Sequence, residues 1–300
     1  MNLQMPLSIL IYHRVLAAPD PLFPEQVDAR RFEQHVRLLN RWFRAIPLAE
    51  AVRRLANRTL PPRAACITFD GGYADNAEVA LPILQRHNTP ATFFTASGFL
   101  DGGCMWNDAV IEVVRNAPGE RLNLGRAGFG VVDIGCPVRR RAVIDMLIAA
   151  LKYLPAGERI ERVKRMARSF TPTMLTSDQV LALHRAGMEI GAHTVSHPIL
   201  SSISNADARA EIAGGRARLE DIIQARVGLF AYPSGKPGRD FEQRHAAMLR
   251  SQGFDAAVTT AWGAARCATD PFQLPRFTPW DRSSGRFLLR MASNMFMPQA

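Results

Sequence analysis

His193-Thr194-Val195-Ser196-His197-Pro198 places two imidazoles four residues apart, directly after the apolar run Met188-Glu189-Ile190-Gly191-Ala192. The apolar run is typical of a short buried strand. Imidazoles at positions i and i+4 can converge on one ion, with their ring nitrogens about 3 Å apart. Zinc, cobalt and similar ions accept neutral imidazoles readily. The segment therefore indicates a metal site at a strand end, with a structural or coincidental pair of histidines as the alternative.

A second segment upstream, Ile67-Thr68-Phe69-Asp70-Gly71-Gly72-Tyr73, joins a β-prone run to a carboxylate and two glycines. A hydrolytic metal site usually needs three protein ligands, an open position for water, and a base that takes a proton from that water. Asp70 can fill only one of these roles. Together, the two segments suggest a hydrolytic metal site.

Short apolar runs alternate with longer segments in which apolar residues recur at spacings of three and four. This pattern predicts repeated βα units and an α/β fold. The predicted strands are Leu7–Tyr12, Ala64–Asp70, Ala91–Thr95, Glu189–Ala192, Leu229–Tyr232 and Ala256–Thr259. The predicted helices are Ala29–Trp42, Ala74–Arg86, Ser177–Ala186, Asp207–Ile223 and Asp240–Gln252. The candidate site residues fall at the carboxyl ends of strands, the catalytic face of a barrel: Asp70, His193, His197 and Tyr232.

Residues 100–176 differ from the flanking sequence. This stretch is partly basic and mostly helical in pattern, and it contains a glycine-rich patch between Gly125 and Gly135. Three hundred residues can form one α/β barrel or two smaller domains, and the 47% hydrophobic content suffices for a large core. No long linker divides the chain. We therefore expect a single domain over residues 1–300, with residues 100–176 inserted between barrel strands.

In the order of its motifs the chain resembles the NodB-type polysaccharide deacetylases, metal-dependent carbohydrate esterases that act on N-acetyl groups. The family's first motif, Thr-Phe-Asp-Asp-Gly, corresponds to Thr68-Phe69-Asp70-Gly71-Gly72. Its second, His-Thr/Ser-Val-Ser/Thr-His-Pro, is matched in full by residues 193–198. Phe230-Ala231-Tyr232-Pro233-Ser234-Gly235 resembles the Tyr-Pro-x-Gly groove motif of one branch. The resemblance extends from Leu7 to about Trp280 and implies a distorted (β/α) barrel, typically with seven strands.

The resemblance also implies roles for individual residues. Asp70 would be the catalytic base, and His193 and His197 would bind a divalent metal such as zinc. Tyr232 and Pro233 would line the groove for an N-acetylated glycan, the expected substrate. In the implied reaction, water loses a proton to Asp70 and attacks the acetyl carbonyl, while the metal stabilises the oxyanion.

Gly71 stands where the family places a metal-binding carboxylate. Without that ligand, two histidines bind a divalent ion more weakly than a complete set. If Asp70 served as the ligand instead, the site would lose its base, and activity would fall roughly 100-fold or more. Three readings stay open: an impaired de-N-acetylase, a glycan-binding pseudoenzyme of the same fold, and an active enzyme into which Gly71 has been introduced.

Two further residues are candidates for catalysis. Many family members take their general acid from a Leu-x-x-His motif near the C-terminus, but no histidine follows His245 here. His13 is a candidate for the proton donor, with a satisfied histidine at a strand end as the alternative. Arg276 ends a late apolar run and is expected to pair with Asp70, since a nearby guanidinium holds a carboxylate ionised and oriented. The alternative for Arg276 is an ordinary surface arginine.

Trp106 precedes a predicted helix from Asp108 to Arg115, for which Asn107 or Asp108 is the expected N-cap. Because aromatic faces stack on sugar rings, Trp106 is a candidate substrate-binding residue. Packing in the core is the alternative.

The formal charge of +10 comes from 37 Lys and Arg against 27 Asp and Glu. Clustered basic residues bind phosphates, but the arginines are spread along the chain with no aromatic-interleaved basic stripe and no zinc-finger spacing. These features disfavour nucleic-acid binding. The net positive charge favours attraction to an anionic envelope glycan or membrane surface.

The cysteines and the N-terminus indicate the compartment. The four cysteines are scattered without a C-x-x-C pair, which predicts reduced thiols and neither a structural zinc site nor a disulfide framework: Cys66, Cys104, Cys136 and Cys267. The first residues lack the basic and apolar regions of a signal peptide, and no apolar run approaches about 20 residues. We therefore expect a cytoplasmic chain with no integral membrane association. The sequence indicates no oligomeric state.

Overall fold

The computed structural model describes residues 5–166, 172–279 and 281–296. Trp280, where the resemblance was expected to end, lies outside these ranges. By their contacts the residues form two compact units. Unit 1 contains the chain up to Ala18, Val27–Asp101 and the chain from Leu175 on, and unit 2 contains Pro19–Gln26 and Gly102–Met174. Unit 2 thus takes in most of the expected insertion, together with a short segment near the N-terminus.

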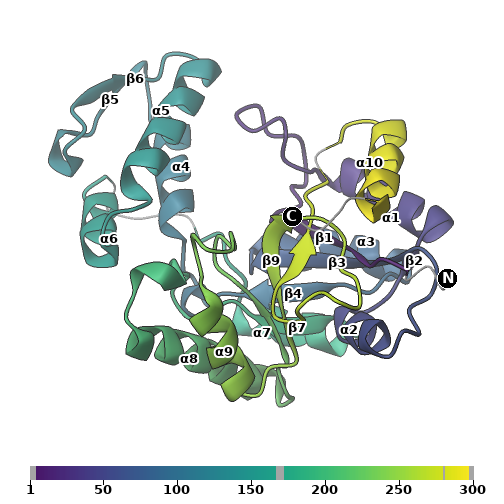
Figure 1. Cartoon of the computed structure of the whole chain (residues 1–300). Coiled ribbons are helices and arrows are strands. Elements are labelled where there is room, and N and C mark those ends of the chain that lie inside the picture. Colours follow the sequence, from purple (N-terminus) through teal and green to yellow (C-terminus); the bar gives the residue numbers. More distant parts are fainter. Residues whose placement is uncertain (1–4, 167–171, 280, 297–300) are drawn as a thin grey trace. The chain divides into compact units, whose positions relative to one another are not determined.

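Unit 1 is built on a parallel sheet. Its strands are β1 (Ser8–Tyr12), β2 (Arg44–Ala45), β3 (Ala64–Gly71), β4 (Thr92–Thr95), β7 (Glu189–Ala192), β8 (Leu229–Ala231), β9 (Ala256–Trp262) and β10 (Leu274–Arg276). Seven follow the order β1-β3-β4-β7-β8-β9-β10, and β2 pairs with the start of β3. Phe277, just after β10, returns to β1: its N–H donates to Ile9 O at 3.0 Å, and its O accepts from Ile11 N at 3.0 Å. The predicted seven-strand barrel is therefore confirmed and is nearly closed (Figure 1).

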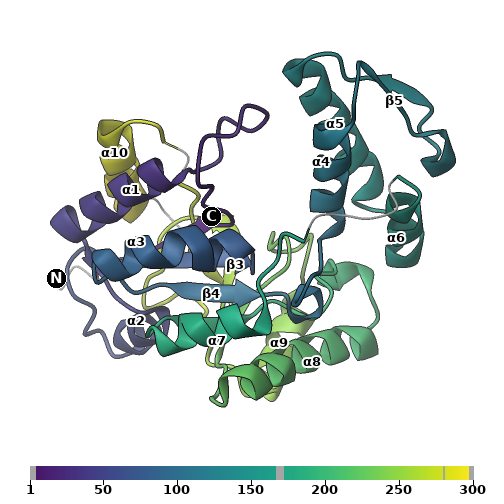
Figure 2. The ribbon, with the colours of Figure 1, turned by 180° about the vertical axis from the view of Figure 1, so that it is seen from behind.

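Helices surround this barrel. They are α1 (Ala29–Trp42), α2 (Leu48–Ala56), α3 (Leu81–Arg86), α7 (Ser177–Arg185), α8 (Asn205–Ile223), α9 (Gln243–Ser251) and α10 (Ser284–Phe296). A π-helical turn, Asn76–Ala80, leads into α3. Figure 2 shows α1, α3, α7 and α8 in succession around the outside of the sheet. The sequence did not predict α2 and α10.

The predicted start of α9 is wrong. Helix α9 begins at Gln243 and not at Asp240. The carboxylate of Asp240 accepts a hydrogen bond from Lys236 N at 3.0 Å, which holds it in the preceding loop. Glu242 then serves as the N-cap and forms a reciprocal capping arrangement with His245.

Alternate residues of the strands pack on opposite sides of the sheet, as the two-residue repeat of a strand requires. One set packs against the covering helices, and includes Leu10, Ile67, Phe69, Phe93 and Phe230. The other set packs with α2, and includes Ile9, Cys66, Phe94, Leu229, Val258 and Leu274. Along β3, Cys66 is followed on this second, inner side by Thr68 and Asp70. The barrel therefore presents Asp70 at the carboxyl end of its inner row.

Unit 2 has a hydrophobic core of its own. It consists of α4 (Trp106–Asn116), α5 (Pro137–Leu151), α6 (Ala156–Lys164) and an antiparallel hairpin of β5 (Arg121–Asn123) and β6 (Val131–Asp133). Its buried residues include Leu22, Phe23, Val110, Val114, Ile144 and Leu147. The segment Pro19–Gln26 therefore supplies part of this core, and no local pattern in the sequence revealed that.

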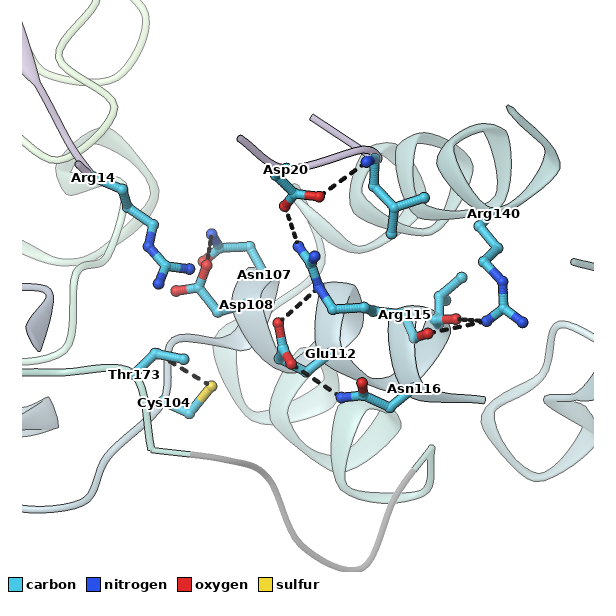
Figure 3. Close-up of polar contacts among 12 residues, drawn as sticks. Arg14, Asp20, Cys104, Asn107, Asp108, Glu112, Arg115, Asn116, Arg140 and Thr173 are labelled. Carbon is cyan, nitrogen blue, oxygen red and sulfur yellow. Dashed lines mark hydrogen bonds and ion pairs between the residues drawn. The ribbon is translucent and has the colours of Figure 1, made fainter. Parts of the chain in front are cut away.

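Polar contacts fix the carboxyl end of α4. The helix begins at Trp106 with Met105 as its N-cap, so the N-cap predicted at Asn107 or Asp108 is wrong. At its other end, the Arg140 guanidinium donates to the carbonyl oxygens of Val114 and Arg115 in the last turn (Figure 3). It also donates to those of Ala117 and Gly119 just beyond the helix. Within the described ranges of both units, no helix is both long enough and apolar enough to span a membrane.

Candidate active site at the carboxyl end of the barrel

The side chains of Asp70 and Arg276 form a buried ion pair, with 2% and 1% of each residue exposed. Arg276 Nη1 and Nη2 donate to the two carboxylate oxygens at 2.7 and 2.6 Å. Nη1 also donates to Thr68 Oγ1 at 3.0 Å, and Nε donates to Thr259 O at 2.8 Å. The ion pair expected between the two side chains is present. The contacts with β3 and β9 hold the guanidinium in one orientation.

This pair sets the charge of Asp70. Burial by itself would raise the pKa of the carboxyl, but the attraction and hydrogen bonds of Arg276 outweigh it and lower the pKa to about 2. Asp70 is therefore an ionised carboxylate at any physiological pH.

His193 and His197 lie beside each other in the loop that follows β7, with ring centroids 4.7 Å apart. His193 Nδ1 lies 2.7 Å from the carbonyl oxygen of Ala231. Because a carbonyl oxygen only accepts, Nδ1 carries the proton of the neutral ring, and the lone pair remains on Nε2. A backbone carbonyl that orients a histidine in this way is typical of metal-ligating histidines.

The loop has an unusual backbone. Thr194 and His197 have φ angles of +66° and +55°, in the left-handed region that side chains rarely adopt and that is least favourable for a β-branched residue such as Thr194. The Thr194 hydroxyl accepts from His197 N at 3.1 Å, which ties the loop to itself. Strained conformations of this kind persist only where surrounding contacts enforce them.

Glu211 on α8 supplies those contacts. Its carboxylate accepts from Val195 N at 2.9 Å, Ser196 N at 2.8 Å and Ser196 Oγ at 2.6 Å. The same helix comes close to the loop only because it has glycine there. A Cβ at Gly215 would lie 2.7 Å from the carbonyl carbon of Thr194. The sequence did not identify Glu211, because a glutamate on a helix gives no local sign of the loop that it binds.

Both site histidines are held neutral. Burial lowers the pKa of His193, against the opposing attraction of Asp70. Burial, aided by the neighbouring His193 and His13, lowers the pKa of His197 to about 3. Neutral imidazole is the form that binds a metal ion.

His13 follows β1 and belongs to the same electrostatic cluster. Part of the residue is exposed, yet desolvation within the site still lowers the pKa of its ring, with Asp70 opposing this change and Arg276 adding to it. Asn76 Nδ2 donates to the backbone oxygen of His13 at 3.0 Å and holds this end of the strand. His13 is therefore coupled electrostatically to Asp70 and Arg276, and its proximity contributes to the lowered pKa of His193 and of His197.

These donors fit a divalent ion of the zinc class, although with fewer ligands than such sites usually have. Two neutral imidazoles suit zinc. Both oxygens of Asp70 are engaged by Arg276, and Gly71 has no side chain to offer. Across residues 5–166, 172–279 and 281–296, no three His, Cys, Asp or Glu side chains are grouped to hold an ion. The described site thus offers two candidate ligands, where hydrolytic zinc sites ordinarily have three.

Comparison with known families identifies the chain. The polysaccharide deacetylase family model matches residues 57–130 and 142–257, more than half of the sequence. The protein is a member of the polysaccharide deacetylase family. Its sequence is 19% identical over 261 residues to YxkH of Bacillus subtilis (strain 168), whose name marks it as a candidate polysaccharide deacetylase. That match covers 86% of this chain and 66% of YxkH, so this chain spans just under two thirds of the length of that relative.

Solved structures show the same polysaccharide deacetylase fold. The deacetylase PplD of Streptococcus pyogenes, solved in complex with acetate, superposes with a TM-score of 0.66 at 19% identity, covering 98% of this chain and 100% of PplD. IcaB from Ammonifex degensii gives a TM-score of 0.61 at 19% identity, covering 97% of each chain. At these identities the likeness establishes the fold alone.

Tyr232 was expected to line the substrate groove of this deacetylase-family protein, but its side chain is part of the core. It is 1% exposed, and its ring stacks on Phe241 with centroids 3.7 Å apart. Its hydroxyl donates to Phe272 O at 3.0 Å, and its backbone N–H donates to Val258 O at 3.3 Å. The side chain therefore cannot contact a glycan. Pro233 is also buried, and its carbonyl oxygen accepts from Gly235 N at 2.7 Å.

Trp106, the other expected groove residue, belongs to unit 2. Its ring packs against the core of that unit, and the guanidinium carbon of Arg159 lies 5.0 Å from the ring centroid. At least one face of the ring is therefore occupied within its own unit. This arrangement agrees with the alternative reading of Trp106 as a packing residue.

Proposed function

We propose that this chain binds an N-acetylated glycan at the carboxyl end of the barrel and hydrolyses its N-acetyl groups. One observation carries the proposal: Asp70, ionised and oriented by Arg276, lies in one electrostatic cluster with neutral His193 and His197. Membership of the polysaccharide deacetylase family supports an acetylated glycan as the substrate.

In the proposed reaction, Asp70 accepts a proton from water as the water oxygen attacks the acetyl carbonyl carbon. The carbon–nitrogen bond then breaks, and the amine leaves with a proton given by the protonated form of His13, which becomes a neutral imidazole; because the pKa of His13 is lowered, this form is a minor one. The products are acetate and the free amino sugar. A carboxylate whose pKa is about 2 stays ionised but is a weak base, because general-base catalysis is most effective when the pKa lies near the working pH. We therefore expect slow turnover.

His193 and His197 are the residues that would hold the divalent metal, and zinc suits both imidazoles. When bound, the ion supplies positive charge that stabilises the oxyanion developing on the acetyl group. Since the described residues offer no third ligand, we expect this ion to bind weakly.

A second function is favoured by that same shortage of ligands. The chain would bind its glycan in the deacetylase groove without hydrolysing it. Three features support this interpretation. Gly71 offers no side chain to a metal, both oxygens of Asp70 are bound by Arg276, and two histidines are the candidate ligands. It predicts glycan affinity that does not depend on metal.

Acetate release from N-acetylated chito-oligosaccharides, measured with added zinc and with a chelator, tests the proposal. The control is Asp70→Asn, which has no base but a similar shape. Zinc-dependent acetate release by the native chain that is lost in Asp70→Asn would support the deacetylase. Binding of the oligosaccharide without acetate release by either protein would support the glycan-binding alternative.

We further infer that unit 2 is an insertion into one deacetylase domain. The chain leaves the barrel after Ala18 and again after Asp101, and it returns at Val27 and at Leu175. Both excursions therefore begin and end within unit 1.

A further inference from the structure

A cavity of about 930 Å³ lies on unit 1 and is lined by residues other than those assigned above. It is bordered by Trp262 at the end of β9, by Asp281, and by Arg282, Arg286 and Arg290 in and before α10. Known ligand pockets of drug-sized molecules have volumes of about 300–1,000 Å³. This cavity is therefore large enough to take one or two sugar rings.

The lining of the cavity is positively charged. Its lining residues include three arginines and one carboxylate. That carboxylate, Asp281, is already bound by Arg290 on both oxygens, at 2.5 and 3.0 Å. Arg286 extends from the exposed side of α10, and no carboxylate lining the cavity neutralises it. The lining thus carries a surplus of arginine charge, which suits an anion with carboxylate or phosphate geometry.

Trp262 gives the cavity an apolar wall beside this charge. The Arg290 guanidinium carbon lies 5.5 Å from the Trp262 ring centroid, within the range of a cation–π contact. Leu289, also on the lining, is 73% exposed. An aromatic ring and an exposed aliphatic group next to arginines form a surface that complements a sugar ring carrying an acidic substituent.

The cavity is close in the fold to the proposed base. Trp262 on β9 is the register partner of Arg276 on β10, and Arg276 binds Asp70. All three residues lie at the carboxyl end of the barrel. A glycan with one N-acetyl group at Asp70 would extend over this end of the barrel toward the cavity.

We propose that this cavity binds an acidic sugar unit, bearing a carboxylate or a phosphate, of the glycan on which the chain acts. The inference rests on the proposed function and deepens it, because it names an anionic glycan as the substrate class. It assigns Arg286 to recognition of the anionic group and Trp262 to contact with the sugar ring.

Calorimetric titration of the full chain tests the proposal with four probes: N-acetylglucosamine 1-phosphate, a glucuronate–N-acetylglucosamine disaccharide, neutral N,N′-diacetylchitobiose, and inorganic phosphate. We expect at least one acidic sugar to bind more tightly than both the neutral disaccharide and inorganic phosphate. Which acidic sugar binds more tightly distinguishes a phosphate from a carboxylate. In Arg286→Ala the acidic sugar should bind about tenfold more weakly, equal to the loss of about 1.4 kcal/mol.

The matched control is Arg209→Ala, which removes the same charge from the exposed surface of α8. Its affinity for the acidic sugar should equal that of the native chain. Three outcomes would each overturn the proposal. They are equal affinity for neutral and acidic sugars, equal affinity for inorganic phosphate and the sugar phosphate, and unchanged affinity for the acidic sugar in Arg286→Ala. Because these readouts need no turnover, they can be repeated in Asp70→Asn. A failure of deacetylation is thereby kept separate from a failure of anionic recognition.

Discussion

The guanidinium of Arg276 binds both carboxylate oxygens of Asp70, at 2.7 and 2.6 Å, although the two residues are 206 positions apart in sequence. Neither side chain has water around it to compensate its charge, since they are 0% and 3% exposed. The pair therefore links the folding of the barrel to the charge state of the proposed base. Removing one partner leaves the other as a buried, uncompensated charge.

We predict that Arg276→Met lowers the free energy of unfolding by about 3–5 kcal/mol, the usual cost of breaking a buried ion pair from one side. The same change removes the attraction that lowers the pKa of Asp70, so that burial raises this pKa. Urea denaturation measures the first effect. The double variant Arg276→Met with Asp70→Asn should recover part of the loss.

Arg226→Met is the matched control for this experiment. Arg226 also donates to both oxygens of a carboxylate, that of Asp255, at 2.6 and 2.9 Å, but the two side chains are 54% and 51% exposed. Exposed pairs typically contribute about 1 kcal/mol or less. Equal losses in the two arginine variants would show that burial does not govern the strength of the Arg276 pair.

We predict that Gly71→Asp strengthens metal binding and lowers the free energy of unfolding. Gly71 has a φ of +107°, a conformation that side chains rarely adopt, and a strained residue of this kind costs about 1–3 kcal/mol. Zinc titration should show affinity that is tighter by about tenfold or more, equal to about 1.4 kcal/mol. Gly71→Ala should show the same folding penalty without the gain in affinity. If Gly71→Asp binds zinc no more tightly than Gly71→Ala, position 71 does not supply a ligand in this fold.

We predict that Glu211→Ala loosens the loop that carries His193 and His197. The carboxylate accepts three hydrogen bonds from that loop, and hydrogen bonds to a charged group contribute about 1.5–3 kcal/mol. A loss of about 2 kcal/mol in urea denaturation and weaker zinc binding are the expected results. Glu211→Gln, which keeps one acceptor oxygen, should fall between Glu211→Ala and the native chain.

Glu50→Ala is a suitable control, because Glu50 pairs with Arg54 of its own helix, one turn away. Such helical pairs contribute roughly 0.2–0.5 kcal/mol. Unchanged zinc affinity in Glu211→Ala would exclude Glu211 as a positioning residue for the histidine loop, even if the chain lost stability.

His35 should make the stability of unit 1 depend on pH. Its ring is buried between Tyr12 Oη at 3.1 Å and Asp281 O at 3.3 Å, and it stacks on Phe287. Burial lowers the pKa of His35 from 6.5 to about 4. The unfolded chain therefore takes up a proton at a higher pH than the folded chain. Stability should fall as the pH is lowered from about 6.5 to about 4, by up to about 1.4 kcal/mol per pH unit for this residue.

Urea denaturation of the native chain and of His35→Gln at several pH values between 7 and about 4.5 measures this contribution. The native chain should lose about 2 kcal/mol more than the variant over this range. The remaining loss in the variant comes from other buried histidines, among them His193 and His197. Parallel stability curves for the two proteins would contradict the assignment.

Much of the barrel was predictable because its signals are local. Buried parallel strands are short and apolar, so six of the seven barrel strands were located to within a few residues, and β10 was indicated by the apolar run before Arg276. Helix α2 is only nine residues long, and it gave too little periodicity to be predicted. Tyr232 was misjudged for a different reason: its ring points to the helix-covered side of the sheet, and the orientation of a strand end is set by its neighbours.

Local pattern alone was enough to establish the α/β class, the repeated βα units, and the presence of Asp70, His193 and His197 at strand ends. It was enough because hydrophobic periodicity and motif spacing depend on residues close together in the chain. Tertiary structure decided the rest. It pairs Arg276 with Asp70, and it places Glu211 where it accepts hydrogen bonds from the histidine loop. It also buries Tyr232, and it groups no third ligand with the histidines among the described residues. Those relationships join residues from different strands and helices. Only closure of the barrel brings such residues within hydrogen-bonding distance, where the loss of water makes their charges matter.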